Sequence, residues 1–428
     1  MRHKFLRVAV IGGGLLTALC AARTAPRTTI RVWLPGFDAQ RDAIAAAYQA
    51  ECPEVSLRLE CPPPEGLYPK LLGAAVGQAL PDLALVDYAS VGPLAENGFC
   101  EPLDAYLDGL RDPAALHPHL RRMLSYGGRI VGLPAAGHPL ALYIRQDWLA
   151  KLNLEPPANW DEFYQVAEAF TKKDPDGNGK PDTHGLAERW PAADPAVAAR
   201  FLPWLYQGGG VVATCQGGKW TPAFGQPAGI RALRLRRRLW DAGLIGPGAP
   251  VSDAAQNMAA FLNGQAGMVV EDDRWVPAVR KALGARAAVV PLPRDIRAGT
   301  VGEGLCFILA RQSNAKWAAF AFVRWWLSRA VQERLVLGWD GKPGGERADG
   351  GVLAIGPRTD MDPAALLGEP LYGGFARSFP YMSPEPYFPN YAALRLILAR
   401  TVAEAMAPGK TVEKALAAGM QEAAVLLQ

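Results

Sequence analysis

One acidic loop has the spacing of a calcium-binding loop. Its oxygen-bearing residues stand at positions 1, 3, 5 and 9 of that pattern and are Asp174, Asp176, Asn178 and Asp182. Position 12, where a bidentate glutamate is expected, holds Gly185. A polar turn whose Asp and Asn side chains bond to their own backbone accounts for the same residues without a metal. The sequence therefore leaves two alternatives, a structural calcium ion and a metal-free turn.

Aromatic residues next to carboxylates indicate a second kind of chemistry, the binding of a sugar. Tyr88 directly follows Asp87, and Trp275 comes three residues after Asp272. Trp204 precedes a run of three glycines, and Trp339 directly follows Gly338. A flat ring offers its face to the C–H side of a sugar, and nearby carboxylates accept hydrogen bonds from its hydroxyl groups. Each ring alone could equally belong to a hydrophobic core, but as a group they favour a carbohydrate site.

Motifs of common enzyme classes are absent from the sequence. The chain has no GxSxG, HExxH or GxxxxGK[ST] motif. No pair of carboxylates can be placed from the sequence at the separation of about 5–10 Å that a glycosidase needs. We therefore expect a binding protein and no enzyme. A secreted carbohydrate-active enzyme remains the alternative from another functional class.

The first 25 residues have the organisation of a secretory signal peptide. Basic residues come first, and an apolar run over residues 8–19 follows. That run is shorter than the roughly 20 residues that span a bilayer. Cys20 stands directly after it, so lipidation of Cys20 and ordinary cleavage after Ala22 or Ala25 are both open. Either route predicts export to the periplasm or to the outer face of the cell membrane, with a lipid anchor as the sole membrane attachment.

The composition predicts a folded protein of two lobes. Half of the 428 residues are hydrophobic and 20% are charged, which is typical of a folded globular protein. A chain of this length is too long for a single hydrophobic core, so two lobes are expected. The net charge is only +4. The one dense basic run, at residues 234–238, lies in a predicted helix, where its arginines are expected to form the solvent-exposed face. We therefore expect no nucleic-acid partner. The cysteines form neither a CxxC pair nor a zinc pattern. Without Cys20 an odd five remain, and a predicted strand separates the nearest two, Cys52 and Cys61, so the fold is not expected to depend on disulfides.

Alternating strand and helix patterns predict an α/β fold with a mostly parallel sheet. The first elements are expected at residues 29–34, 38–48, 55–59, 68–80 and 83–86. Ligands of such sheets bind beyond the carboxyl ends of the strands. Phe37 and Asp38 follow the first strand, and Asp87 and Tyr88 follow the third. A later strand, residues 266–270, leads into the acidic run before Trp275.

In a series of short segments taken in order, the chain resembles the family-1 extracellular solute-binding proteins of bacterial ABC importers, the maltose-binding-protein-like group. Among these segments are LPDLALVD (80–87), YGGRIVGLP (126–134), PLALYIRQDWL (139–149), FLPWLYQGGG (201–210) and AAFLNGQAGMVVEDDRW (259–275). The DPDGNGKPD loop recurs in such proteins at this place. The resemblance covers nearly all of the chain after residue 25.

This resemblance implies a periplasmic-binding-protein-like (type II) fold, in which a ligand cleft lies between two discontinuous lobes. Crossings between the lobes are expected near residues 136–141, 302–304 and 328–335. The first lobe is then residues 26–138 plus 304–330, and the second is residues 139–303 plus 331–428. The ligand binds the closed state more tightly than the open state and thereby shifts the population by a hinge motion.

The resemblance also implies ligand-binding positions. They are Phe37, Asp38, Asp87 and Tyr88 in the first lobe, Trp204, Asp272 and Trp275 in the second, and His138 and Glu303 at the crossings. Arg377 stands where relatives often place a basic ligand contact. His138 replaces the acidic residue common in sugar-binding relatives, and Glu303 interrupts a usual double glycine, so the substrate stays open.

The sequence thus predicts the solute-binding component of an ABC importer, which binds a sugar between two lobes and delivers it to the transmembrane permease subunits. We expect it to act as a monomer, with no cofactor apart from the undecided calcium ion. A binder of glycerol-3-phosphate or another phosphorylated polyol is the alternative within the same class. It would need several Arg, Lys or backbone N–H donors at one spot, and Arg377 supplies only one.

Overall fold

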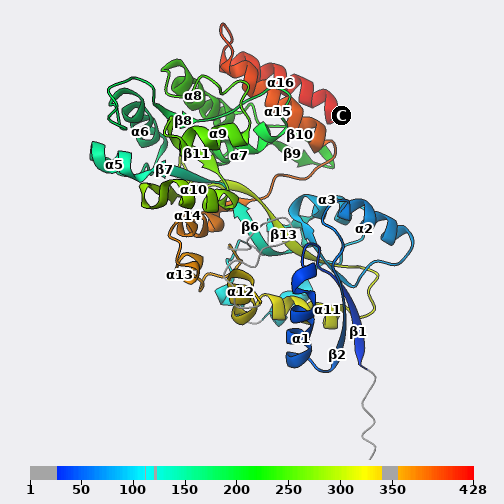
Figure 1. Ribbon diagram of the computed structural model, residues 1–428. Helices are drawn as coiled ribbons and strands as arrows, with labels where there is room; N and C mark the ends of the chain where they lie inside the picture. Colours follow the sequence, from blue (N-terminus) through cyan, green and yellow to red (C-terminus); the bar gives the residue numbers. More distant parts are fainter. Residues whose placement is uncertain (1–26, 111, 120–122, 340–354) are drawn as a thin grey trace, which may run out of the picture.

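The computed structural model describes residues 27–110, 112–119, 123–339 and 355–428, which form two α/β lobes joined at a narrow waist (Figure 1). The predicted signal peptide and Cys20 lie outside the described residues. Within the described part of the chain, no helix combines the length and the apolar character needed to cross a membrane.

The first lobe is built on a sheet with a parallel centre. Its strands β2 (Val55–Glu60), β1 (Thr28–Trp33) and β3 (Leu83–Asp87) are parallel, and β13 (Thr300–Leu309) joins β3 in the antiparallel sense. The lobe's helices are α1 (Arg41–Glu51), α2 (Leu67–Val76), α3 (Tyr88–Glu96), α11 (Lys316–Trp326) and α12 (Arg329–Leu337). The first four residues of β3 are buried, as expected for a strand covered on both faces. The predicted alternation of strand and helix is confirmed here.

The second lobe has a mixed sheet in the order β12 (Ala287–Val290), β7 (Ala141–Arg145), β11 (Ala266–Glu271) and β8 (His184–Ala187). Only β11 and β8 are parallel, because β7 runs against both of its neighbours. The mostly parallel sheet that residues 29–86 predict is thus a feature of the first lobe, and the sheet of the second lobe is mixed. Its helices are α5 (Gln146–Leu152), α6 (Trp160–Lys172), α7 (Ala196–Gln207), α8 (Pro227–Asp241), α9 (Ala254–Leu262), α10 (Val276–Leu283), α13 (Pro363–Leu367), α14 (Leu371–Ser378), α15 (Tyr391–Met406) and α16 (Val412–Leu426).

Two short hairpins and one short edge strand complete the sheets. The hairpin β4 (Ser125–Tyr126) and β5 (Arg129–Ile130) belongs to the first lobe. The hairpin β9 (Ala213–Gln216) and β10 (Lys219–Pro222) belongs to the second, and both of its turn residues are glycines with positive φ. Strand β14 (Met382–Ser383) pairs with the start of β13.

Two antiparallel strands connect the lobes. Strand β6 (Leu133–Pro139) runs beside β13, so that His138 lies opposite Glu303 and Gly137 lies opposite Gly304. A Cβ atom at Gly304 would lie 2.4 Å from the Ala136 carbonyl oxygen, which explains why glycine is needed there. These strands pass between the lobes at the first two predicted crossings.

The third crossing lies later in the chain than predicted. Helix α12 remains in the first lobe, where Val331 and Leu335 share a hydrophobic cluster with Ile30. Figure 1 shows α12 beside α11, whereas α14 lies under the second lobe and packs on β12. The predicted boundary after residue 330 is therefore wrong, because the apolar face of α12 completes the first core.

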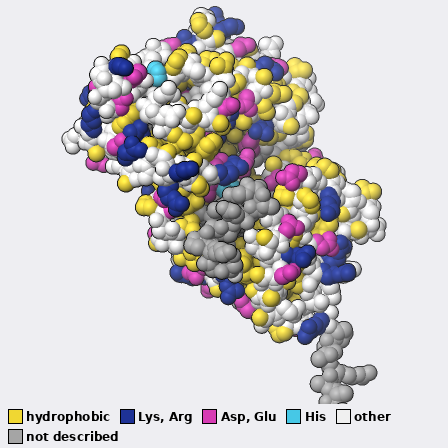
Figure 2. Space-filling model, viewed as in Figure 1, with side chains coloured by type: hydrophobic (Ala, Val, Ile, Leu, Met, Phe, Trp, Pro, Cys, Tyr) yellow, Lys and Arg dark blue, Asp and Glu magenta, His cyan; other side chains and the backbone are white. Residues whose placement is uncertain are grey.

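The basic run of α8 is largely paired within the second lobe. Arg236 is fully buried, and its guanidinium lies 2.9 Å from a carboxylate oxygen of Glu188. The more exposed Arg234 pairs with Glu413. The prediction of a solvated face is thus wrong for Arg236. On the face shown in Figure 2, basic and acidic side chains are intermixed.

The five described cysteines are all free thiols. They are Cys52, Cys61, Cys100, Cys215 and Cys306.

Candidate functional site

Two cavities meet where the lobes join, and Glu385 lines both of them. The first, of about 510 Å³, lies between the second lobe and the connecting strands, and we call it the hinge pocket. Its central side chains are His138, Arg189, Arg200, Glu271, Asp272, Arg274, Trp275, Glu303, Glu385 and Arg395. The second, of about 770 Å³, is called the aromatic cavity. Both volumes fall in the range of small-molecule sites, roughly 300–1,000 Å³.

A turn at the end of β11 supplies one wall of the hinge pocket. Strand β11 is buried along its whole length and ends at Glu271, so the polar residues that follow are held at the edge of the sheet. The Asp272 carboxylate accepts a hydrogen bond from the Arg274 backbone N–H at 3.0 Å and starts a short 3₁₀ helix, Asp273–Trp275. The Tyr143 hydroxyl donates to the Asp272 carbonyl at 2.8 Å. This turn presents the half-buried ring of Trp275 to the pocket.

The turn is tied to both connecting strands by ion pairs. His138 Nδ1 on β6 lies 2.7 Å from Asp273 Oδ1, and an Arg274 guanidinium nitrogen lies 3.0 Å from Glu303 Oε2 on β13. Arg274 also binds Asp272 at 2.6 Å. Burial alone would raise the pKa of Asp272, but the hydrogen bond and the charge of Arg274 lower it below its ordinary value.

Deeper in the pocket, arginines and carboxylates are also paired. Arg200 binds Glu271 at 2.5 Å, and Arg395 Nε lies 3.2 Å from Glu385 Oε2. Burial raises the pKa values of both Glu271 and Glu385 above the ordinary range. Arg189 binds Asp194 at 2.7 Å through one terminal nitrogen, while its buried Nε has no hydrogen-bond partner in the described part of the chain. The pocket is therefore rich in hydrogen-bonding groups, and its charges are balanced.

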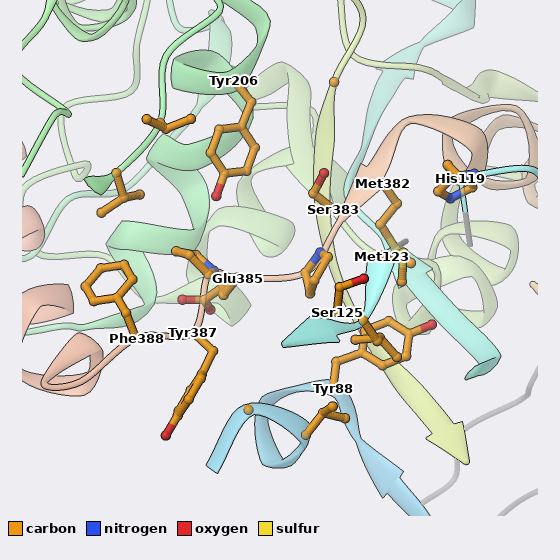
Figure 3. A pocket seen from close by; sticks show the side chains of 18 of the residues that line it. Tyr88, His119, Met123, Ser125, Tyr206, Met382, Ser383, Glu385, Tyr387 and Phe388 are labelled. Carbon is orange, nitrogen blue, oxygen red and sulfur yellow. The ribbon is translucent and has the colours of Figure 1, made fainter. Parts of the chain in front are cut away.

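The aromatic cavity lies between α3 of the first lobe and the α7 and β10 region of the second. Figure 3 shows Tyr88 on the first-lobe side and Tyr206 on the second-lobe side, with Glu385 on the segment between them. The Tyr88 hydroxyl already donates to the Ala136 carbonyl at 2.7 Å. Trp220 is stacked on Phe388, with ring centroids 4.8 Å apart. Much of the aromatic surface here is thus engaged in packing.

The structure brings four of the sequence-predicted residues together in the hinge pocket, namely His138, Asp272, Trp275 and Glu303. Tyr88 lies instead in the aromatic cavity. Asp38 and Asp87 are exposed and line neither cavity. The Asp87 carboxylate accepts a hydrogen bond from the Ser90 backbone N–H at 2.8 Å, so it caps the start of α3.

Three predicted ligand contacts are wrong for this conformation. The side chain of Phe37 is 3% exposed and lies edge-on to Trp326, because the residues after β1 turn into the first core. Trp204 is 1% exposed and packs on Trp160 and Phe163 of α6, because it lies on a side of α7 that faces the core of the second lobe. Arg377 lines a separate cavity beside α13 and α14, where it reaches the Val289 carbonyl at 3.4 Å.

Most of the charged pocket residues were not predicted. Glu271 and Asp273 were visible in the acidic run after β11, although only Asp272 was selected. Arg189, Arg200, Glu385 and Arg395 come from separate segments of the chain. No local motif marks them, because they meet only after the lobe has folded.

The acidic loop satisfies its own backbone. The Asp174 carboxylate accepts hydrogen bonds from the N–H groups of Gly177, Asn178 and Gly179 at 3.0–3.1 Å. The Asn178 side-chain amide donates to Asp182 at 3.1 Å. Among the residues that the structure describes, no group of three or more His, Cys, Asp or Glu side chains is arranged to hold a metal ion. These bonds are those expected of the polar-turn alternative, and calcium binding stays the other alternative.

Comparisons with known proteins agree with this architecture. The MalE sugar-binding protein of Xanthomonas citri superposes with a TM-score of 0.77 at 18% identity, over 94% of this chain and 97% of that one. The cyclic alpha-maltosyl-1,6-maltose binding protein of Arthrobacter globiformis gives a TM-score of 0.73 at 21% identity, over 94% of this chain and 99% of that protein. At such identities the likeness shows the fold, and it confirms the expected two-lobe type.

Curated relatives are similar in sequence over different lengths. The maltotriose-binding protein of Pyrococcus abyssi is 26% identical over 369 residues, which are 82% of this chain and 71% of that protein. The polygalacturonan/rhamnogalacturonan-binding protein YtcQ of Bacillus subtilis is 34% identical over 164 residues, or 36% of this chain and 32% of the relative. Lipoprotein LipO of the same bacterium is 28% identical over 188 residues, which are 42% of this chain and 36% of LipO. The chain thus spans about a third of the length of these two Bacillus relatives.

A family model decides the classification. Residues 43–343, more than two thirds of the chain, match the model for bacterial extracellular solute-binding protein. The fold, the paired connecting strands and this match agree, and the chain belongs to the bacterial extracellular solute-binding protein family.

Proposed function

We propose that this protein is the sugar-binding component of an ABC importer and that it holds its ligand in the hinge pocket. It works outside the cytoplasm, in the periplasm or at the outer membrane face, and passes the sugar to permease subunits without chemical change. The observation that carries this proposal is the half-buried ring of Trp275, which stands beside buried hydrogen-bonding groups in one pocket. The similarity to a maltotriose-binding protein and to a polygalacturonan/rhamnogalacturonan-binding protein also supports a carbohydrate ligand.

Hinge closure completes the proposed site. The hinge pocket is lined by the second lobe and the connecting strands, so the first lobe has yet to contribute its face. Asp38 and Asp87 follow β1 and β3 at the carboxyl ends of the first sheet, where such folds bind ligands. A sugar that bridges both lobes stabilises the closed state, and the permease then recognises that state.

Charge pairing in the pocket favours a neutral sugar over a phosphorylated polyol. Arg200, Arg274 and Arg395 each have a carboxylate partner. A phosphate group would therefore meet Glu271, Asp272 and Glu385 as well as the cations. A sugar hydroxyl can donate a hydrogen bond to a carboxylate and accept one from a guanidinium group, so a neutral sugar can bind both kinds of side chain.

A thermal-shift screen of the protein against mono-, di- and oligosaccharides, uronic acids and glycerol-3-phosphate tests the proposal. A ligand at 100 times its dissociation constant adds about 2.7 kcal/mol to the free energy of unfolding. We expect stabilisation by one neutral sugar series and none by glycerol-3-phosphate. Stabilisation by phosphorylated ligands alone would overturn the sugar assignment. Release of shorter products from an oligosaccharide would favour the enzyme alternative.

A further inference from the structure

We propose that His138 is a positioning residue of the sugar site: one ring nitrogen holds the turn that carries Trp275, and the other is offered to the ligand. This inference rests on the proposed function and adds to it a residue that sets both the geometry and the hydrogen bonding of the pocket.

The first half of the inference rests on the contact with Asp273. His138 Nδ1 and Asp273 Oδ1 are 2.7 Å apart, and the two side chains are only 12% and 2% exposed. Asp273 is the first residue of the short helix that ends at Trp275. A buried, charged hydrogen bond at one end of so short a segment restricts the position of the other end. The connecting strand therefore fixes where the Trp275 ring stands.

The second half rests on the other ring nitrogen. His138 lines the hinge pocket, and its hydrogen bond of 2.7 Å is made by Nδ1, so that among the residues the structure describes Nε2 has no hydrogen-bond partner. Because Asp273 is an acceptor, Nδ1 carries a hydrogen in both the neutral and the protonated ring. Nε2 is then an acceptor at high pH and a charged donor at low pH. A sugar hydroxyl can bind either form, and binds the charged donor more strongly.

Glu303 forms a matching second contact. It lies opposite His138 on β13, and it binds Arg274, the residue next to Asp273. The paired residues His138 and Glu303 of the connecting strands thus bind two consecutive residues of the same turn, Asp273 and Arg274. Any rotation of the lobes about β6 and β13 is passed to the turn, and so to Trp275.

The groups around the ring set its protonation. Asp272, Asp273 and Arg274 face it from the turn, Glu303 lies opposite on β13, and Tyr372 of α14 interacts with Asp273. Burial alone would lower the pKa of His138, but the charge and hydrogen bond of Asp273 outweigh burial and raise it above the ordinary 6.5. The protonated ring therefore persists to higher pH than a free imidazole, and it loses its proton as the pH rises through the folded-state pKa.

The first test measures sugar affinity against pH by calorimetry, for the wild type, His138→Gln and the control His184→Gln. His184 lines another cavity, in the second lobe. We expect the wild-type affinity to fall about 3- to 10-fold as His138 loses its proton, since a charged donor becomes a neutral acceptor. The His138→Gln variant should show a flat profile, and His184→Gln should match the wild type. A His138→Gln profile that keeps the wild-type fall would overturn the inference.

The second test needs no ligand, so it separates this inference from the proposed function. The protein is labelled with 5-fluorotryptophan, and the Trp275 signal is identified by its loss in Trp275→Phe. We expect this signal to shift with pH in the wild type and to stay fixed in His138→Gln and Asp273→Asn. If no sugar binds but the signal titrates as expected, the proposed function fails and the positioning role stands. A signal that titrates equally in all three proteins would refute the positioning role.

Discussion

Gly304 lies directly against the ring of Tyr88, at the point where β13 enters the first lobe. A Cβ atom at Gly304 would lie 2.4 Å from Tyr88 Cζ and 2.4 Å from the Ala136 carbonyl oxygen. The Tyr88 hydroxyl is itself bound to that carbonyl, so neither neighbour can move without breaking a buried hydrogen bond. The close approach of β13, α3 and β6 therefore depends on one absent methyl group.

We predict that Gly304→Ala lowers the free energy of unfolding by about 1–3 kcal/mol, the usual cost of overpacking. Urea denaturation measures it. Gly246→Ala is the matched control, because the nearest atom to its added Cβ is 3.8 Å away, on His184. Equal stability of the two variants would show that β13 can shift.

The Trp275→Ala variant should weaken sugar binding by about 1–3 kcal/mol, because a stacked, partly desolvated ring is lost. Trp220→Ala is the control, since Trp220 lies in the aromatic cavity and is stacked on Phe388. Calorimetry with the sugar found in the screen compares the two. If only Trp220→Ala lost affinity, the sugar would have to bind in the aromatic cavity and not in the hinge pocket.

The buried pair of Arg236 and Glu188 should be costly to break. Glu188→Gln leaves a buried guanidinium without a counter-charge, and we expect a loss of about 3–5 kcal/mol. The exposed pair of Arg234 and Glu413 provides the control, because Arg234→Ala should cost about 0–1 kcal/mol. Urea denaturation curves of both variants give the two losses in free energy of unfolding. The double variant Arg236→Met with Glu188→Leu should recover most of the loss, and a double variant as unstable as Glu188→Gln would contradict the charge argument.

Stability should depend on pH through His138. Its folded-state pKa is raised above 6.5, so its contribution is fully present below pH 6.5 and is lost as the pH rises through the folded-state pKa. The stability difference between the wild type and His138→Gln should therefore be larger at pH 5.5 than at pH 9. Urea denaturation at both values measures this, and a difference that grows toward pH 9 would give the pKa shift the opposite sign.

The acidic loop should be indifferent to metal removal. Three backbone N–H groups already bind the Asp174 carboxylate, so we expect the melting temperature to be the same in EDTA and in millimolar calcium. Asp174→Ala should lower the melting temperature equally in both buffers, through loss of the turn. A rise in melting temperature with calcium that disappears in Asp174→Ala would establish the calcium site instead.

The parts of the fold that depend on local pattern could be predicted from the sequence. The first three strands and their helices repeat at short spacing, and each shows its own periodicity. The third crossing could not be predicted, because the position of α12 depends on which core has room for Val331 and Leu335. The antiparallel direction of β7 likewise depends on partners far along the chain.

The two tryptophans show where prediction of the site stops. Trp204 and Trp275 both stand near turns, yet Trp204 faces the core and Trp275 faces a pocket. The packing of α7 against α6 buries Trp204, and no residue near Trp204 in the sequence indicates that packing. The pairing of Arg200 with Glu271 joins residues 71 positions apart, so no local motif could indicate it.

The pairing of β3 with β13 also governs when the protein can fold. Val86 and Cys306 meet in this ladder although they are 220 positions apart. A chain emerging from the ribosome cannot complete the first sheet, or cover it with α11, until residues beyond 300 have been synthesised. Contacts of such sequence separation also slow folding. The interleaved lobes thus delay collapse of the first lobe until most of the chain is available, which is compatible with the export that the proposed function requires.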